Sequence, residues 1–171
     1  MKTLILYTGS PEGCTEAMAR RIAARIGGEA NPVPLRGKGA PAPAEYDLVV
    51  LGAGVRAGAV GRKMSRYLRA NLPALLNVPC AIYLCCADAC KADTVFAENF
   101  PPALLRHALH TVCLGGRLNP AAKGMDGFIS RMVIGAMQKE GKPLPQPDEA
   151  AADAFADALR AGPREDADKN T

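Results

Sequence analysis

The chain has 171 residues, of which 49% are hydrophobic and 22% are charged, and its net charge at pH 7 is +4. This length and composition fit one globular domain and exclude a largely disordered chain. The mild charge gives no indication of a nucleic-acid-binding protein. We expect a single domain over residues 1–162, followed by a polar, disordered tail over residues 163–171.

Membrane insertion is not indicated by the sequence. No segment approaches the roughly 18 consecutive apolar residues of a membrane helix, and the first apolar run lacks a cleavable signal pattern. Six cysteines in such a protein are expected to be reduced. We therefore predict a cytoplasmic protein with at most peripheral membrane contact.

The first two predicted elements are a strand and a helix. Residues 3–7 form a short apolar run, typical of a strand that is buried on both faces. Over residues 15–26 apolar side chains recur at helical spacing, at Met18, Ile22 and Ile26. A pair of glycines then ends the predicted helix.

The loop between this strand and helix reads Gly-Ser-Pro-Glu-Gly-Cys-Thr-Glu. Backbone N–H groups and the positive end of the helix point into such a loop, so Ser10, Gly13 and Thr15 are predicted to form a phosphate cradle. Pro11 removes one N–H donor, and Glu12 adds a carboxylate. The alternative is a strand-to-helix turn in which these residues serve only geometry and capping.

Strands and helices alternate along the rest of the chain. The further predicted strands are 30–35 (an edge strand with two prolines), 47–52, 80–85 and 111–114. The further predicted helices are one from 62 that Pro73 disturbs, 95–107 with a restart near 103, 125–138 and 148–160. This alternation predicts a three-layer α/β sandwich around a parallel sheet of order 2-1-3-4-5.

This strand order predicts where a ligand binds. Ligands of such sheets lie beyond the carboxyl ends of the strands where the strand order reverses, here between the first and third strands. The loops expected to meet there are 9–15, 53–61 and 86–93, with 115–123 at the rim.

Two segments carry a family resemblance. The first loop resembles the FMN-phosphate loop of flavodoxins, Ser/Thr-x-Thr-Gly-x-Thr. Residues 46–58 and 115–128 are similar to the flavin loop and to the segment after the last strand in flavodoxin-type, menaquinone-dependent protoporphyrinogen oxidases. The resemblance implies a flavodoxin-like fold, one non-covalently bound FMN, and a redox partner protein or quinone as electron acceptor.

A set of cofactor-binding residues follows from the loops and the resemblance. The FMN phosphate is expected at the first loop and the ring between the other two. Arg56 is expected to place positive charge near the reduced ring, with an exposed loop arginine as the alternative. The predicted FMN-binding residues are Ser10, Glu12, Gly13, Cys14, Thr15, Ala53, Gly54, Val55, Arg56, Ala57, Gly58, Cys86, Ala87 and Asp88.

The cysteines fall into two sets. Three lie on predicted buried strands, where a thiol acts as a small hydrophobic group: Cys80, Cys85 and Cys113. Three lie in loops expected at the ligand site: Cys14, Cys86 and Cys90. Cys14 is also near a helix N-terminus, which lowers a thiol pKa. Their spacing matches no standard metal-ligand pattern, so we predict no metal site.

Two functional classes remain open. The first is an FMN oxidoreductase or electron carrier, which the cradle residues favour. The second is a flavodoxin-fold binding or regulatory module that has lost FMN, which Glu12 and the lack of aromatic residues in segments 53–61 and 86–94 favour. The segment near residues 121–124 also lacks the aromatic and arginine residues of the resembling oxidases, so we expect no more than weak protoporphyrinogen oxidation.

Basic residues are concentrated on two predicted helices. They are Arg20, Arg21, Arg25, Arg62, Lys63, Arg66 and Arg69. Such a surface favours an acidic redox partner or an anionic membrane surface, and the alternative is a solvated face without a partner.

Overall fold

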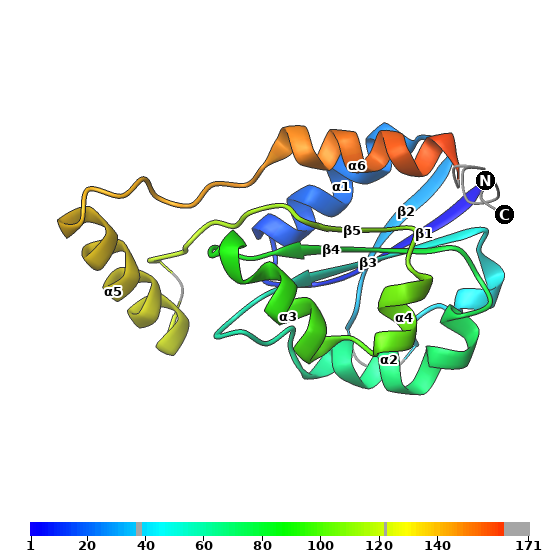
Figure 1. Ribbon diagram of the computed structural model, residues 1–171, viewed down its shortest axis with the longest axis horizontal. Helices are drawn as coiled ribbons and strands as arrows, with labels where there is room; N and C mark the ends of the chain where they lie inside the picture. Colours follow the sequence, from blue (N-terminus) through cyan, green and yellow to red (C-terminus); the bar gives the residue numbers. More distant parts are fainter. Residues whose placement is uncertain (37–38, 122, 163–171) are drawn as a thin grey trace, which may run out of the picture.

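A parallel sheet of five strands runs through the centre of the computed structural model, which describes residues 1–36, 39–121 and 123–162 (Figure 1). Its order, β2-β1-β3-β4-β5, is the predicted one. The predicted tail, residues 163–171, lies outside the described residues. The strands are β1 (Lys2–Thr8), β2 (Glu29–Pro34), β3 (Leu48–Gly54), β4 (Cys80–Cys85) and β5 (His110–Cys113).

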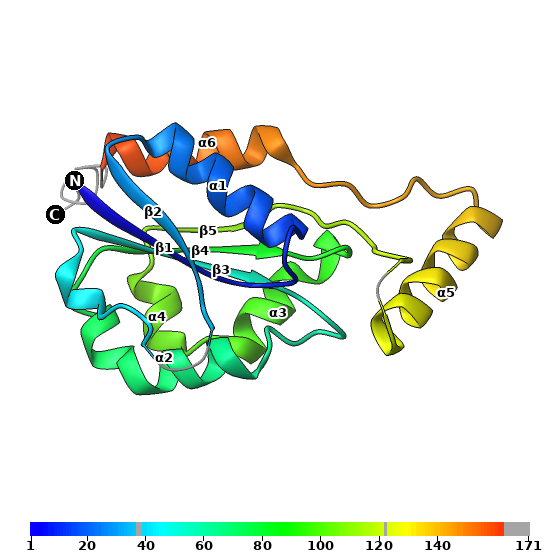
Figure 2. The same ribbon diagram turned by 180° about the vertical axis from the view of Figure 1, so that it is seen from behind.

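Helices cover both faces of this sheet. α1 and α6 lie on one face, and α2, α3 and α4 lie on the other (Figures 1 and 2). The α-helices are α1 (Cys14–Ile26), α2 (Arg62–Leu75), α3 (Ala92–Asn99), α4 (Pro102–His107), α5 (Met125–Lys139) and α6 (Glu149–Ala161). Short 3₁₀ helices are η1 (Pro43–Glu45) and η2 (Ala89–Lys91).

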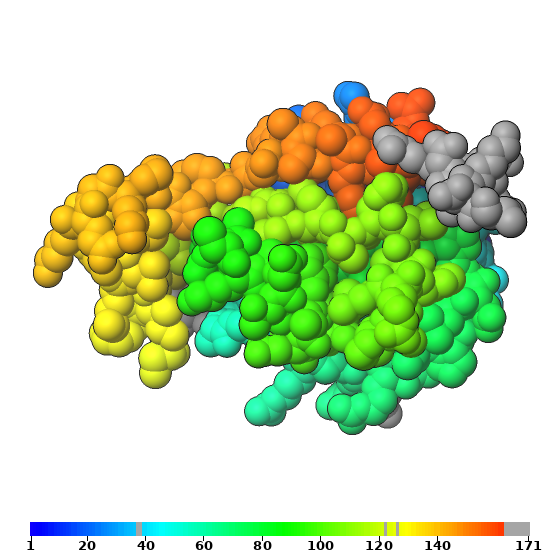
Figure 3. Space-filling model, viewed as in Figure 1, coloured from blue at the N-terminus to red at the C-terminus, as the bar shows by residue number. Residues whose placement is uncertain are grey.

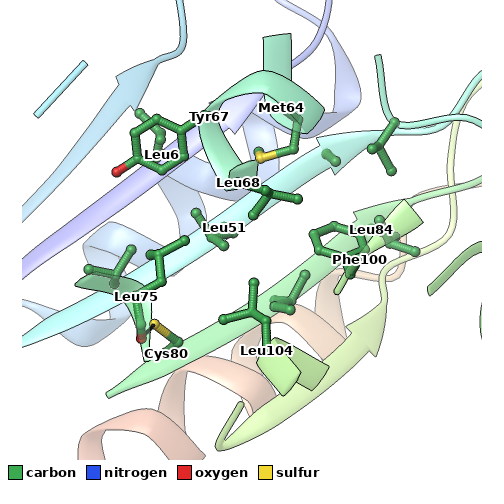
Figure 4. Packing of buried hydrophobic residues seen from close by; sticks show 14 of the residues in the cluster. Leu6, Leu51, Met64, Tyr67, Leu68, Leu75, Cys80, Leu84, Phe100 and Leu104 are labelled. Atoms are coloured by element: carbon green, nitrogen blue, oxygen red, sulfur yellow. Dashed lines mark hydrogen bonds between the residues drawn. The ribbon is translucent and has the colours of Figure 1, made fainter. Parts of the chain in front are cut away.

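The core has two parts, one on each side of the sheet. Along β3, Val49 and Leu51 pack under α2 and α4, whereas Leu48 and Val50 pack under α1 and α6. Successive side chains of a strand point to opposite faces, so a strand covered on both faces is apolar throughout. Figure 4 shows the first part of the core, where Leu51 lies among side chains from α2 and β4.

Prolines shift two of the predicted boundaries. α2 continues past Pro73 to Leu75, so the helix is longer than expected. Residues 95–107 divide into α3 and α4, and α4 begins at Pro102. Proline is tolerated at the first position of a helix because an N–H there would have no acceptor within the helix. Cys113, predicted to be buried, is only half-buried because β5 is an edge strand.

The basic residues of α1 are paired within the molecule. Arg21 binds Asp153 of α6 through Nε and Oδ1 at 2.7 Å, and Arg25 binds Asp157 through Nη2 and Oδ2 at 2.6 Å. Both pairs are bidentate, which fixes the direction of the two helices relative to one another. Both arginines remain at the surface, and their charges are paired with carboxylates of α6.

A tyrosine of β4 connects the sheet to the start of α1. Tyr83 is fully buried, and its hydroxyl donates to the backbone oxygen of Thr15 at 2.9 Å. Gly52 of β3 lies opposite it, and a Cβ at that position would overlap the tyrosine ring. The glycine thus leaves room for the ring, and the ring helps to position the N-terminus of α1.

α5 stands apart from the sandwich (Figures 1 and 2). Among the described residues, no helix or strand packs extensively against it. Most of its large apolar side chains are exposed, whereas Ile134 and Met137 are half-buried. No helix within the described ranges has both the length and the apolar composition needed to cross a membrane.

Candidate functional site

The first loop makes a tight turn before α1. The N–H of Gly13 donates to the backbone oxygen of Ser10 at 3.0 Å, and Glu12 between them has a φ of 56°, in the left-handed region. The side chain of Glu12 is exposed. α1 begins at Cys14 without a side-chain cap at its N-terminus, so the helix end faces the loop directly.

Glu16 is the carboxylate that engages this loop. Its Oε2 accepts from the backbone N–H of Glu12 at 3.0 Å, and its Oε1 accepts from Nη2 of Arg20 at 2.6 Å. The Glu12 N–H, together with the Arg20 guanidinium, holds the pKa of Glu16 below its usual range. An internal anion thus occupies an N–H of the predicted phosphate cradle. Our sequence analysis missed this role, although a Glu at the third helical position often reaches back in this way.

A hydrogen bond joins the first loop to the loop that follows β3, residues 55–61, which we call the third loop. Nη2 of Arg56 donates to Oγ of Ser10 at 2.6 Å, which joins two residues that the sequence analysis assigned to the same site. Arg56 is presented by a hairpin in which it exchanges two backbone bonds of 3.0 Å with Ala59. Ala57 and Gly58 have φ values of 48° and 79° and form the tip of this hairpin.

The ends of β1 and β3 approach α1 closely. A Cβ on Gly54 would lie 2.9 Å from Oγ1 of Thr15, and a Cβ on Gly9 would lie 3.0 Å from Cβ of Thr15. Thr15 is therefore only 4% exposed, and it serves packing at this junction. The hydroxyl of Thr8 at the end of β1 is buried and has no hydrogen-bond partner among the described residues.

Asn99 of α3 holds the third loop in place. Its Nδ2 donates to the backbone oxygen of Gly58 at 2.8 Å, and its Oδ1 accepts from the N–H of Val60 at 3.1 Å. Nδ2 also donates to the oxygen of Val95 within α3. The sequence analysis missed this residue, because nothing in the local pattern of α3 indicates a contact about 40 positions away.

The loop after β4 lies at the same edge of the sheet, and we call this region at the carboxyl ends of β1, β3 and β4 the crevice. Cys86 is buried, its thiol donates to the backbone oxygen of Asp88 at 3.3 Å, and burial raises its pKa. Ala87 and Asp88 are exposed. A Cβ on Gly116 would lie 2.8 Å from the backbone nitrogen of Ala87, so the rim loop packs directly on this backbone. The N–H of Val55 donates to the backbone oxygen of Cys85 at 3.0 Å, and this bond connects the loop after β3 to the end of β4.

Two thiols face each other where α1 begins. Cys14 is half-buried, and a hydrogen bond from Cys85 together with the positive charge of Arg117 lowers its pKa. The same hydrogen bond and burial raise the pKa of Cys85. Cys85 is buried as predicted, but it also contacts a residue of the site. Cys90 is exposed in η2.

Two hollows flank the loops. A cavity of about 210 Å³ opens beside the first loop and is lined by Thr8, Glu16, Arg36 and Lys63, among others. A groove of about 340 Å³ follows α2, where three arginines and Asn99 line it. Ala53 of the predicted site lies inside β3 and is fully buried, so its side chain faces the core.

Comparisons with known proteins agree with this fold. Residues 4–143 match the family profile described as a flavodoxin domain, and no curated protein matches the chain. Oxidised flavodoxin 1 from Bacillus cereus superposes with a TM-score of 0.50 at 14% identity, covering 95% of this chain and 99% of that one. An NADH:FMN oxidoreductase in its apo form gives 0.56 at 10% identity, covering 97% and 92%. At these identities the two structures show similarity of fold.

Proposed function

Because the chain belongs to the flavodoxin-domain family, we propose that it binds one FMN non-covalently and acts in electron transfer or as a small flavin oxidoreductase. The observation that carries the proposal is the hydrogen bond between Arg56 and Ser10. It joins the first and third loops across the carboxyl ends of β1 and β3, where the strand order reverses and such sheets bind ligands.

The residues at this crevice suit the phosphate end of FMN. The guanidinium of Arg56 and the uncapped N-terminus of α1 both present positive charge to the first loop. The hydroxyl of Thr8 is a buried polar group whose hydrogen bond is unmet among the described residues, and a ligand oxygen or a bridging water would satisfy it. Ser10 and Gly13 would hold the phosphate.

Bound FMN would supply a ring that accepts and releases electrons. The protein would present backbone to both sides of it, from the Ala57–Gly58 tip and from Ala87–Asp88, because these segments carry little side chain. Asn99 holds the tip, so the ring would meet a hairpin that is already in place.

Titration with FMN and with riboflavin tests the proposal. We expect FMN to bind at least about tenfold more tightly than riboflavin, since only FMN has a phosphate to meet the charges at the first loop. Arg56→Met should weaken FMN binding and leave riboflavin binding unchanged. Equal affinities for the two flavins would contradict the phosphate cradle. The spectrum of protein purified without added flavin shows directly whether FMN is retained.

A second candidate function is a flavodoxin-fold binding or regulatory module without FMN. It is favoured by the bond from the Glu12 N–H to Glu16, because this carboxylate takes one of the loop donors and repels phosphate. Protein that purifies colourless and takes up no FMN in titration would support this candidate and exclude the first.

The partner and substrate are part of the proposal. We propose a redox partner protein or a quinone as electron acceptor, and a cytoplasmic location in which the six cysteines, all free thiols here, stay reduced. We expect no more than weak protoporphyrinogen oxidation, because Ala121 and Gly124 stand where the resembling oxidases have aromatic and basic residues. Robust FMN-dependent turnover of protoporphyrinogen with a menaquinone analogue would contradict that expectation.

A further inference from the structure

α5 presents its large apolar side chains to solvent. They recur at spacings of three and four residues, so they form one stripe along the helix. In the space-filling view the α5 segment projects from the sandwich (Figure 3). An exposed apolar surface of this kind indicates an interaction site. The stripe consists of Met125, Phe128, Ile129, Met132 and Val133, which are between 38% and 69% exposed.

The opposite side of α5 is less exposed. Ser130 is only 8% exposed and Gly127 is buried. Nη1 of Arg131 donates to the backbone oxygen of Pro120 at 2.8 Å, which ties the helix to the loop before it. The apolar stripe is therefore the most exposed side of α5.

The segment around α5 is basic. Residues 117–146 include five basic and two acidic side chains, a net charge of +3 out of +4 for the whole chain. One of the acidic residues, Glu140, is already bound to Lys142 at 2.7 Å. Like charges disfavour pairing of this surface with a second copy of itself. The positive charges of residues 117–146 are complementary to an anionic surface.

We propose that α5 docks on an anionic lipid bilayer. The docking surface is the apolar stripe together with Lys123 and Lys139. α5 has 15 residues and is about 22 Å long, shorter than the roughly 30 Å of a hydrocarbon core, so it would lie in the plane of the headgroups. α5 lies beyond the carboxyl ends of the strands, at the same end as the crevice (Figure 1). This proposal does not depend on FMN binding.

Sedimentation with lipid vesicles tests the docking. The full chain is mixed with phosphatidylcholine vesicles or with vesicles that also contain phosphatidylglycerol. We expect binding to the anionic vesicles that weakens as salt is added. The double variant Phe128→Ser/Met132→Ser should lose about a hundredfold in binding, since both side chains leave water on docking. Its thermal unfolding should change little, because both side chains are more than half exposed.

A charge-matched pair of variants separates docking from general attraction. Lys123→Gln/Lys139→Gln should lose about 25-fold in binding to the anionic vesicles, about fivefold for each lysine. Arg62→Gln/Arg69→Gln removes the same charge from α2 and should change binding much less.

Three results would overturn the proposal. They are equal binding to neutral vesicles, binding that survives the serine variant, and the absence of vesicle binding by a protein that sediments as a dimer until the serine variant makes it a monomer. The last result would assign the stripe to a second copy of the chain.

Discussion

The carboxylate of Glu16 accepts a hydrogen bond of 3.0 Å from the backbone N–H of Glu12, while Arg20 binds its other oxygen at 2.6 Å. The carboxylate that would repel a phosphate at the first loop is therefore that of Glu16 and not that of Glu12. The side chain of Glu12, which the sequence indicated as the obstacle to a phosphate, is exposed. The negative charge that touches the loop belongs to Glu16.

Replacing Glu16 should therefore strengthen FMN binding. A carboxylate a few ångströms from a phosphate repels it, and Arg20 offsets part of this repulsion, so we expect Glu16→Ala to tighten FMN binding about tenfold. Affinities measured at low and high salt check the cause, because screening should shrink the gain. Glu12→Asn is the matched control and should change affinity little, since Asn tolerates the left-handed φ and the lost charge was exposed. Weaker FMN binding by Glu16→Ala would instead mean that Glu16 holds the loop in its binding shape.

Asn99 should support FMN binding without touching the cofactor. Asn99→Ala leaves the N–H of Val60 without its acceptor at a partly buried place, which costs about 1–3 kcal/mol and loosens the 56–60 hairpin. We expect weaker binding of both FMN and riboflavin, because the hairpin borders the ring and not only the phosphate. Asn99→Asp keeps the acceptor but places a carboxylate oxygen against the backbone oxygens of Gly58 and Val95, so it should not restore binding. An effect on FMN alone would contradict a role in holding the hairpin.

Cys14 should be more reactive than an ordinary thiol. The hydrogen bond from Cys85 and the charge of Arg117 lower its pKa, so more thiolate is present at neutral pH. Alkylation by iodoacetamide, followed by peptide mass spectrometry, should reach half its limiting rate at a pH below the ordinary thiol pKa of about 8.5. Cys85→Ala removes the hydrogen bond and should shift this midpoint upward. The exposed Cys90 serves as an internal control in the same digest.

FMN should slow the alkylation of Cys14 if the crevice is its binding site. Cys14 is the first residue of α1, directly beside the predicted phosphate cradle. Riboflavin at the same occupancy should protect less. An alkylation rate of Cys14 that is unaffected by bound FMN would place the cofactor elsewhere.

Acid should weaken the contact between α1 and α6. The guanidinium groups of Arg21 and Arg25 lower the pKa values of Asp153 and Asp157 in the folded state. These pairs therefore stabilise the fold fully above the unfolded carboxyl pKa of about 3.9, and the stabilisation is lost as the pH falls through the lower folded values. Urea unfolding should show Asp157→Asn to be less stable than the parent at pH 7.

The same comparison at low pH tests the assignment. Once the carboxylates are protonated, the parent and Asp157→Asn should unfold at nearly the same urea concentration. Asp93→Asn, on the exposed side of α3, should show no such pH-dependent difference. If Asp157→Asn is still less stable to urea than the parent in acid, the loss of stability comes from helix propensity and not from the ion pair.

The sequence by itself determined the layout of the fold. Apolar runs such as 3–7 and 80–85 predict doubly covered strands, because a strand with helices on both faces has no side that can stay polar. The alternation with helical segments then predicts a parallel sheet and its order. The family membership and the strand order confirm these predictions. The individual FMN-binding residues remain predictions.

Only the tertiary structure decided which side chains meet. The contacts of Arg56 with Ser10 and of Asn99 with Gly58 join residues about 40 positions apart, and no local pattern carries that information. The role of Gly52 depends likewise on the ring of Tyr83 in the neighbouring strand. α5 gives the clearest case, because an apolar stripe at helical spacing is the same sequence pattern whether a core or solvent lies opposite it. Its exposure is decided by where the surrounding loops place the helix.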